Sequence, residues 1–266
     1  GNTSVKSTAH EVTGDAVDVL YVKGSGWDLG RIEPPGFPAC RLAPLRRLCA
    51  MDALNDDAMV TALRSQMLDP ASPTPSVEAL LHAFLPGKFV DHTHADAVLA
   101  LQDQPDARAR AAEVWGPSFL FVPYGMPGFA LAQQVVALAA HLPMVHGLIL
   151  EQHGIFTWGA TARESYERMI AGVTAAEEWR SDRPARATPR SGTARVNVAE
   201  LRAPIMSALR GAIARAGDGR FLMEWRTEPA IMALAAREDG PELTARGTVT
   251  PDHVIRTKPR PLWLDI

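Results

Sequence analysis

The sequence has little cysteine, little excess charge and no long apolar runs. Two cysteines, Cys40 and Cys49, occur in 266 residues without the spacing of a metal or redox motif, so we expect no disulfide framework and a reducing, cytoplasmic setting. A net charge of −3 at pH 7 excludes the basic footprint of a nucleic-acid-binding protein. No apolar run is long enough to cross a bilayer and no secretory leader is visible, so we expect no membrane partner.

The chain does have enough apolar sequence for one sizeable core, with 47% hydrophobic residues. Thr161 and Glu164 form a capping box ahead of a well-defined helix that extends to Trp179. The other predicted helices are 42–54, 57–68, 74–85, 94–102, 106–114, 128–141, 199–215 and 228–237. Strands are predicted at 15–23, 88–94, 118–122, 145–151, 154–158 and 221–225.

This pattern divides the chain into three parts. Residues 1–180 are predicted to form a catalytic domain, and residues 196–266 an α/β extension that packs on the same domain. Between them, residues 181–195 are rich in arginine, proline, serine and threonine, which indicates a mobile linker. A role of these arginines in binding nucleic acid is the less favoured alternative.

Three histidines have the pattern of metal ligands. In an extended segment residues two apart project to the same face, so His92-Thr93-His94 directs two imidazoles to one point. His153 follows an apolar strand and precedes Gly154, which frees the backbone at a turn. Neutral imidazole suits zinc, and three protein ligands leave one coordination position open for catalysis. The alternative is a chance pair of histidines, since the chain has eight.

Glu78 is predicted in the first turns of a helix that has Thr74 as its N-cap and Pro75 at the first helical position. Such a carboxylate either complements the helix dipole or acts as a general base beside a metal. His82 lies one turn further along, and we interpret it as an ordinary structural histidine.

Two short polar segments have the composition of anion-binding loops. One is Gly1-Asn2-Thr3-Ser4, and the other is Lys23-Gly24-Ser25-Gly26, which directly follows a predicted strand. Amides exposed by glycine, together with an ammonium group and the Ser76 hydroxyl, suit a phosphate. The alternative for each segment is a plain surface turn.

These pieces together resemble the class II aldolase/adducin family. The resemblance spans residues 1 to about 180 and rests on the order of the segments Asn2-Thr3-Ser4, Lys23-Gly24-Ser25-Gly26, Ser76-Val77-Glu78 with His82, His92-Thr93-His94, Val122-Pro123-Tyr124 and Gln152-His153-Gly154. It implies an α/β fold with three α/β/α layers around a central, largely antiparallel or mixed sheet. It also implies a homotetramer.

The resemblance also implies roles for individual residues. His92, His94 and His153 match the zinc ligands, although another divalent cation is also possible. Glu78 matches the acid that transfers protons, and Tyr124 is a weaker match to a catalytic tyrosine. The matches to the phosphate-binding residues are Asn2, Lys23, Ser25, Gly26 and Ser76.

Two departures from the family pattern stand out. Val77 occupies a position where many members have a second serine, so its backbone amide would have to replace a hydroxyl contact. The chain also begins at Gly1 inside what resembles a glycine-rich loop, and we expect that the helix that usually comes before this loop is missing.

The end of the chain carries a second, narrower resemblance. Residues 250–259 resemble the end of the aldolase half of two-part proteins that join a rhamnulose-1-phosphate aldolase-like region to a short-chain dehydrogenase. We expect Asp252, His253, Arg256 and Lys258 either to approach the active site or to form a solvated C-terminal strand or arm.

The resulting hypothesis is a zinc-dependent aldolase. It would reversibly cleave a ketose 1-phosphate, such as a rhamnulose-1-phosphate-like sugar, to dihydroxyacetone phosphate and an aldehyde through a metal-stabilised enediolate. The alternatives are an epimerase or dehydratase that uses the same metal site, a non-catalytic adducin-like interaction module, and a wholly structural zinc site.

Overall fold

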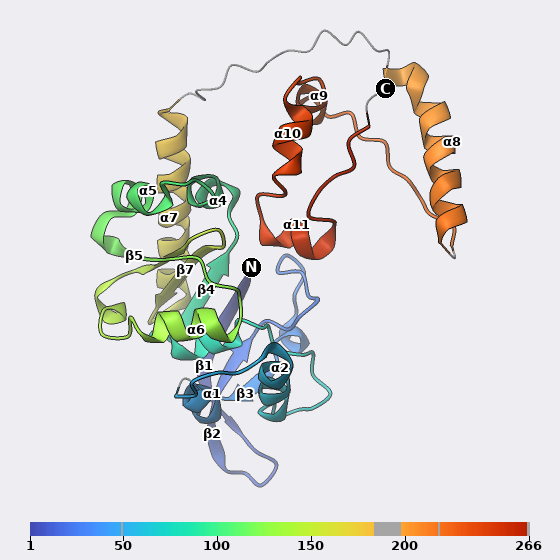
Figure 1. Cartoon of the computed structure of the whole chain (residues 1–266). Coiled ribbons are helices and arrows are strands. Elements are labelled where there is room, and N and C mark those ends of the chain that lie inside the picture. Colours follow the sequence, from blue (N-terminus) through green and yellow to red (C-terminus); the bar gives the residue numbers. More distant parts are fainter. Residues whose placement is uncertain (49, 184–197, 218, 265–266) are drawn as a thin grey trace. The chain divides into compact units, whose positions relative to one another are not determined.

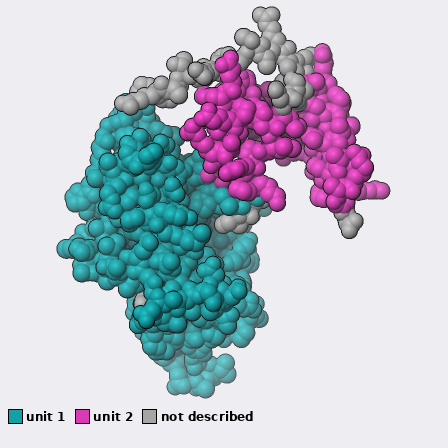
Figure 2. All heavy atoms as spheres, in the orientation of Figure 1, with its two compact units in different colours: residues 1–184, 249–257 teal, residues 185–248, 258–266 magenta. Residues whose placement is uncertain are grey.

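The computed structural model describes residues 1–48, 50–183, 198–217 and 219–264, and the chain forms two compact units. Unit 1 comprises Gly1–Pro184 and Val249–Thr257, and unit 2 comprises Ala185–Thr248 and Lys258–Ile266 (Figure 2). Cys49 and most of the predicted linker at 181–195 lie outside the described residues. No helix among the described residues is both long and apolar enough to span a membrane.

Unit 1 is built on one seven-stranded sheet with the order β3-β2-β1-β4-β7-β6-β5 (Figure 1). Among the described strands, β5 and β6 pair in parallel and all other neighbours are antiparallel. The mixed sheet predicted above is therefore confirmed. The strands are β1 (Asn2–His10), β2 (Ala16–Val22), β3 (Ala39–Arg41), β4 (Phe89–Thr93), β5 (Phe119–Val122), β6 (Gly147–Leu150) and β7 (Gly154–Gly159).

Each face of the sheet buries its own apolar cluster. Along β6, Leu148 and Leu150 belong to one cluster and Ile149 to the other, because successive side chains point to opposite faces. Helices α1 (Leu42–Leu48), α2 (Asp56–Ser65), α3 (Ala79–Phe84) and α6 (Phe129–Val136) contribute to the first cluster. Helices α4 (Asp96–Gln102), α5 (Ala107–Trp115) and α7 (Ala162–Ser181) contribute to the second. The sheet and the helices on its two faces are the three predicted layers.

The cap of α7 forms as the sequence predicts. Thr161 Oγ1 accepts a hydrogen bond from the Glu164 amide at 3.1 Å, and Glu164 Oε2 accepts one from the Ala160 amide at 2.7 Å. These bonds satisfy amides that have no partner within the helix.

Two segments near the site differ from the prediction. Residues 2–4, predicted as a polar loop, begin strand β1, with Asn2 and Ser4 both buried. The helix predicted from Thr74 begins only at Ala79, because the Thr74 carbonyl accepts a hydrogen bond from the Ser25 amide and Pro75 bridges to Gly24. The tertiary contacts of 74–76 therefore override the local helix-start signal.

The C-terminal region contains helices α8 (Val198–Ala216), α9 (Pro229–Ala235), α10 (Gly240–Ala245) and α11 (Pro251–Arg256). The predicted strand at 221–225 does not form, since a strand requires a partner and unit 2 has no other strand among its described residues. Residues 251–256, predicted as an arm or strand, form α11, which belongs to unit 1.

Candidate metal centre

The three histidines lie at the junction of β4 and the turn between β6 and β7. His92 is on β4 opposite Phe156 of β7, and His94 follows the last residue of that strand. His153 lies in a tight turn in which Gly154 has a φ of +149°. A Cβ on Gly154 would lie 2.3 Å from the Thr93 carbonyl oxygen, so this close approach requires glycine.

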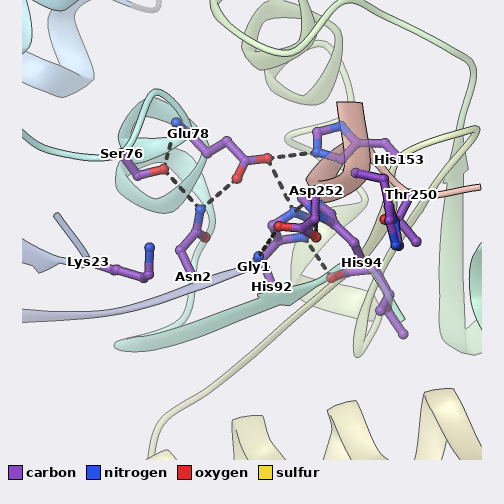
Figure 3. A network of polar contacts seen from close by, with 12 residues as sticks. Gly1, Asn2, Lys23, Ser76, Glu78, His92, His94, His153, Thr250 and Asp252 are labelled. Atoms are coloured by element: carbon purple, nitrogen blue, oxygen red, sulfur yellow. Dashed lines mark hydrogen bonds and ion pairs between the residues drawn. The ribbon is translucent and has the colours of Figure 1, made fainter. Parts of the chain in front are cut away.

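Glu78 completes a cluster of four possible ligands (Figure 3). One ligand atom of each residue lies within 4.8 Å of the others. Glu78 Oε1 is 2.8 Å from His153 Nε2 and 3.3 Å from His92 Nε2, and the Nε2 atoms of His92 and His94 are 2.8 Å apart. The four residues come from three separate segments of the chain.

The outer ring nitrogens show how two of the imidazoles are oriented. His92 Nδ1 donates to the Ile155 carbonyl at 2.9 Å, and His94 Nδ1 donates to the Asp252 carboxylate at 2.6 Å. In the neutral form both Nε2 atoms then carry lone pairs that face each other. Such a contact is repulsive unless a proton or a cation lies beside it.

Burial sets the charges of the cluster. It lowers the pKa of His92 well below the usual value, and it also lowers the pKa of His94. Burial acts to raise the pKa of Glu78, but the adjacent imidazoles of His92 and His153 hold that pKa well below its usual value. Neutral imidazoles and an ionised carboxylate are the states that bind metals. Glu78 Oε1 and His153 Nδ1 are also buried without a hydrogen bond among the described residues, so the cluster fits a divalent metal site.

A chain of hydrogen bonds supports the other oxygen of Glu78. Asn2 Nδ2 donates to Glu78 Oε2 at 2.6 Å and lies 3.0 Å from Ser76 Oγ. The Asn2 side-chain oxygen accepts from His82 Nε2, and Ser4 Oγ is 2.7 Å from His82 Nδ1. The sequence indicated an ordinary structural role for His82, whereas its contacts connect it to Glu78 through Asn2.

The residues predicted to bind phosphate lie on neighbouring segments. The Ser76 amide donates to the Lys23 carbonyl, and Ser25 Oγ is 3.4 Å from the Pro75 carbonyl oxygen. The amides of Gly26 and Val77 have no hydrogen-bond partner among the described residues. Gly26 has a φ of +87° with open space where a Cβ would be.

Tyr124 is separate from this network. The residue is 50% exposed beyond the end of β5, and its backbone amide donates to Glu151 Oε2 at 2.9 Å. Within the described part of the chain its hydroxyl makes no hydrogen bond. Its catalytic role stays a prediction.

Of the C-terminal residues expected near the site, Asp252 contacts the cluster through His94. His253 Nδ1 is 2.5 Å from Oγ1 of Thr250, the residue that precedes the same helix, and Lys258 belongs to unit 2. The side chain of Arg256 lies outside the described residues.

Comparisons with known proteins agree on one family. Residues 1–179 match the family described as Class II Aldolase and Adducin N-terminal domain, and residues 200–266 match Aldolase class II, second domain. The N-terminal class II aldolase domain of a conserved protein from Thermoplasma acidophilum is 40% identical, with a TM-score of 0.64 over 67% of this chain and 82% of that one.

Two curated relatives extend this comparison. The uncharacterized oxidoreductase YuxG of Bacillus subtilis (strain 168) is 33% identical over 270 residues, which is all of this chain but only 39% of that relative. A methylthioribulose-1-phosphate dehydratase of Pectobacterium atrosepticum is 41% identical over 44 residues, or 16% of this chain and 21% of its own length.

Proposed function

Because this chain belongs to the class II aldolase and adducin family, we propose that it is a zinc-dependent lyase that reversibly cleaves a ketose 1-phosphate to dihydroxyacetone phosphate and an aldehyde. The observation that carries the proposal is the convergence of Glu78 with three imidazoles at a buried site. A rhamnulose-1-phosphate-like sugar is the proposed substrate.

His92, His94 and His153 would hold the cation, and three imidazoles with one further oxygen ligand are a donor set that zinc favours. When bound, zinc supplies Lewis-acid stabilisation of the enediolate charge that develops as the C3–C4 bond of the sugar breaks. Glu78 would be the fourth donor, and its exchange for substrate would keep the site catalytic rather than structural.

Glu78 is the residue to which we assign proton transfer. Its Oε2 is held by Asn2, whereas Oε1 has no hydrogen bond among the described residues and faces the imidazoles. In the aldol direction Oε1 would remove a proton from the reacting carbon of dihydroxyacetone phosphate, and in cleavage it would return that proton.

The neighbouring loops supply donors for the substrate phosphate. The proposed phosphate site includes the amides of Gly26 and Val77, which have no partner among the described residues. Its other members are the Ser25 and Ser76 hydroxyls, the Asn2 amide and the Lys23 ammonium group. The Val77 amide would take the place of the missing serine hydroxyl. Tyr124 is kept as a candidate catalytic residue.

The test is Glu78→Gln assayed on a panel of ketose 1-phosphates, with zinc supplied and then chelated. Loss of general acid–base catalysis typically costs about 10²–10⁴-fold in rate, so aldehyde release should fall to background while zinc stays bound. Glu167→Gln, at an exposed acid of α7, is the matched control and should keep full activity. A fully active Glu78→Gln enzyme would refute the proposed role.

The alternative reaction class is dehydration or epimerisation at the same metal site. The short match to a methylthioribulose-1-phosphate dehydratase favours dehydration of the two. The same panel distinguishes them, because a lyase releases an aldehyde, an epimerase yields an isomer and a dehydratase yields a product lighter by one water. An adducin-like module without catalysis would yield none of these and would not require zinc.

The proposal extends to the location and assembly of the protein. We propose a cytoplasmic homotetramer whose partner is a small sugar phosphate. Sedimentation of the purified chain would test the number of subunits. The length of the Bacillus relative and its description as an oxidoreductase fit a two-part arrangement of an aldolase with a dehydrogenase.

A further inference from the structure

The helix α11 places a carboxylate behind one of the candidate metal ligands. It lies within the stretch 200–266 that matches the second domain, yet residues 249–257 belong to unit 1. Asp252 of this helix is 158 positions from His94 in the sequence and contacts its imidazole (Figure 3). The candidate metal centre therefore includes a residue beyond the stretch that matches the N-terminal domain.

The geometry of this contact defines the state of His94. Asp252 Oδ2 is 2.6 Å from His94 Nδ1, and the His94 side chain is only 8% exposed. A carboxylate accepts hydrogen bonds and does not donate when ionised, so Nδ1 must carry the proton. The lone pair is then on Nε2, the atom that faces His92 in the cluster.

The other two imidazoles do not depend on this kind of partner. His92 is a residue of β4, and its Nδ1 donates to a backbone carbonyl of the adjacent strand β7. His153 Nδ1 is buried with no hydrogen bond among the described residues. His94 lies beyond the last residue of β4, where strand pairing no longer orients it. Asp252 orients the His94 imidazole, as the β7 carbonyl orients the His92 imidazole.

Local structure places Asp252 where it can do this. Thr250, which is buried, has an extended backbone and precedes the helix, and Pro251 occupies one of its first two positions. Asp252 is in the first turn, where an acidic side chain is favourable. Its carboxylate is therefore held by a short helix rather than by a freely rotating tail.

We propose that Asp252 is a positioning residue of the metal centre, which fixes His94 in the tautomer and orientation that present Nε2 to a divalent cation. This inference rests on the metal site of the proposed function. It makes the affinity for the cation depend on a segment of the second domain. Hydrogen-bonded partners of this kind typically contribute about 10–100-fold to metal affinity.

The test compares Asp252→Ala and Asp252→Asn in the full chain. Zinc affinity measured by competition with a chromophoric chelator should weaken about 10–100-fold for the alanine variant. The asparagine variant should lose less, because its side-chain oxygen still accepts the His94 hydrogen bond. Glu242→Gln removes an exposed carboxylate of α10 that pairs with Arg246 and should leave the affinity unchanged.

A second measurement does not require zinc. Nitrogen-15 chemical shifts of the His94 ring in the metal-free protein should report protonation at Nδ1 in the parent and in Asp252→Asn. The alanine variant should shift toward a mixture of tautomers. Asp252 has a side chain that is 42% exposed, so the fold should survive the change, and far-ultraviolet circular dichroism checks this.

The outcomes separate the two proposals. Unchanged zinc affinity together with an unchanged His94 tautomer in Asp252→Ala would overturn the role of Asp252 and leave the lyase proposal intact. A parent protein that binds no divalent cation would overturn the proposed function, and the ring shifts alone would then decide whether Asp252 positions His94.

Discussion

The imidazole of His82 shows how burial determines the chemistry of a single residue. Its exposed fraction is 0%, and burial lowers its pKa from 6.5 to about 3. Because the Asn2 oxygen accepts from Nε2, the neutral ring must take its second hydrogen bond at Nδ1 from the Ser4 hydroxyl. This arrangement orients the Asn2 amide, so that Nδ2 is directed to Glu78.

The same shift predicts a pH dependence of stability. The unfolded state takes up a proton on His82 below pH 6.5, whereas the folded state does so only near pH 3. The contribution of His82 to the free energy of unfolding is therefore fully present above pH 6.5. It falls by about 1.4 kcal/mol for each pH unit below that value. Urea unfolding of the metal-free protein between pH 6 and pH 4 gives the free energy of unfolding as a function of pH. The slope of this dependence should be smaller by that amount in His82→Gln than in the parent.

The control for this experiment is His141→Gln, which changes an exposed histidine. It should leave the slope as in the parent. Equal slopes for the parent and His82→Gln would mean that His82 is not the buried neutral group described above.

Among individual residues, the candidate ligands were predictable, but the residues that support them were not. His92 and His94 follow from a two-residue spacing in an extended segment, which depends only on local backbone geometry. His82 and Asp252 have no such local pattern. Their contacts join residues 80 and 158 positions apart, which no sequence spacing indicates.

At the level of elements, the turn between β6 and β7 carries the strongest constraint. Gly154 combines a positive φ with a close approach to the Thr93 carbonyl, and His92 Cε1 lies 3.3 Å from the position of its missing Cβ. The turn therefore sets the distance between His153 and the β4 histidines.

Gly154→Ala should both destabilise the fold and weaken zinc binding. The added Cβ would have to displace β4 at the metal centre, since it would meet a backbone atom rather than a flexible side chain. Gly14→Ala is the matched control, because Gly14 also has a positive φ, of +91°, but nothing lies within 4 Å of its Cβ position.

The control should cost only the backbone strain, about 1–2 kcal/mol, and keep the parent's zinc affinity. Chemical denaturation and chelator competition measure the two effects. If Gly154→Ala behaves like Gly14→Ala in both, then the close approach to Thr93 does not constrain the site.

The errors in element prediction share a cause. Asn2 and Ser4 are polar because they contact Glu78 and His82 from within a strand, yet polar composition usually marks a loop. Thr74 and Pro75 have the residue types of a helix start, but the contacts of residues 74–76 with 23–25 keep them extended. In both cases tertiary contacts decided between two locally acceptable conformations.

On the scale of the whole molecule, the cluster connects segments that folding must bring together. Its candidate ligands come from the residue before α3, from the end of β4 and from the turn after β6. A cation that binds all of them binds the folded state only, so it should stabilise unit 1.

Zinc should therefore raise the midpoint of thermal unfolding. Free zinc at 100 times its dissociation constant would add about 2.7 kcal/mol to the free energy of unfolding, and a chelator should remove this gain. His153→Ala, which lacks one ligand, should gain much less from the same zinc concentration. An equal gain in both proteins would place the stabilising cation at another site.

The sequence by itself determined the layered α/β fold, the capped helix α7 and the choice of the three histidines and Glu78 as members of a candidate metal cluster. Each of these depends on local periodicity, capping or spacing, or on an ordered set of motifs shared with a family. Only the tertiary structure decided that Asn2 belongs to a strand, that His82 supports Asn2 and that Asp252 contacts His94. These features depend on contacts between distant segments, whose free energies outweigh the small local preferences of a few residues.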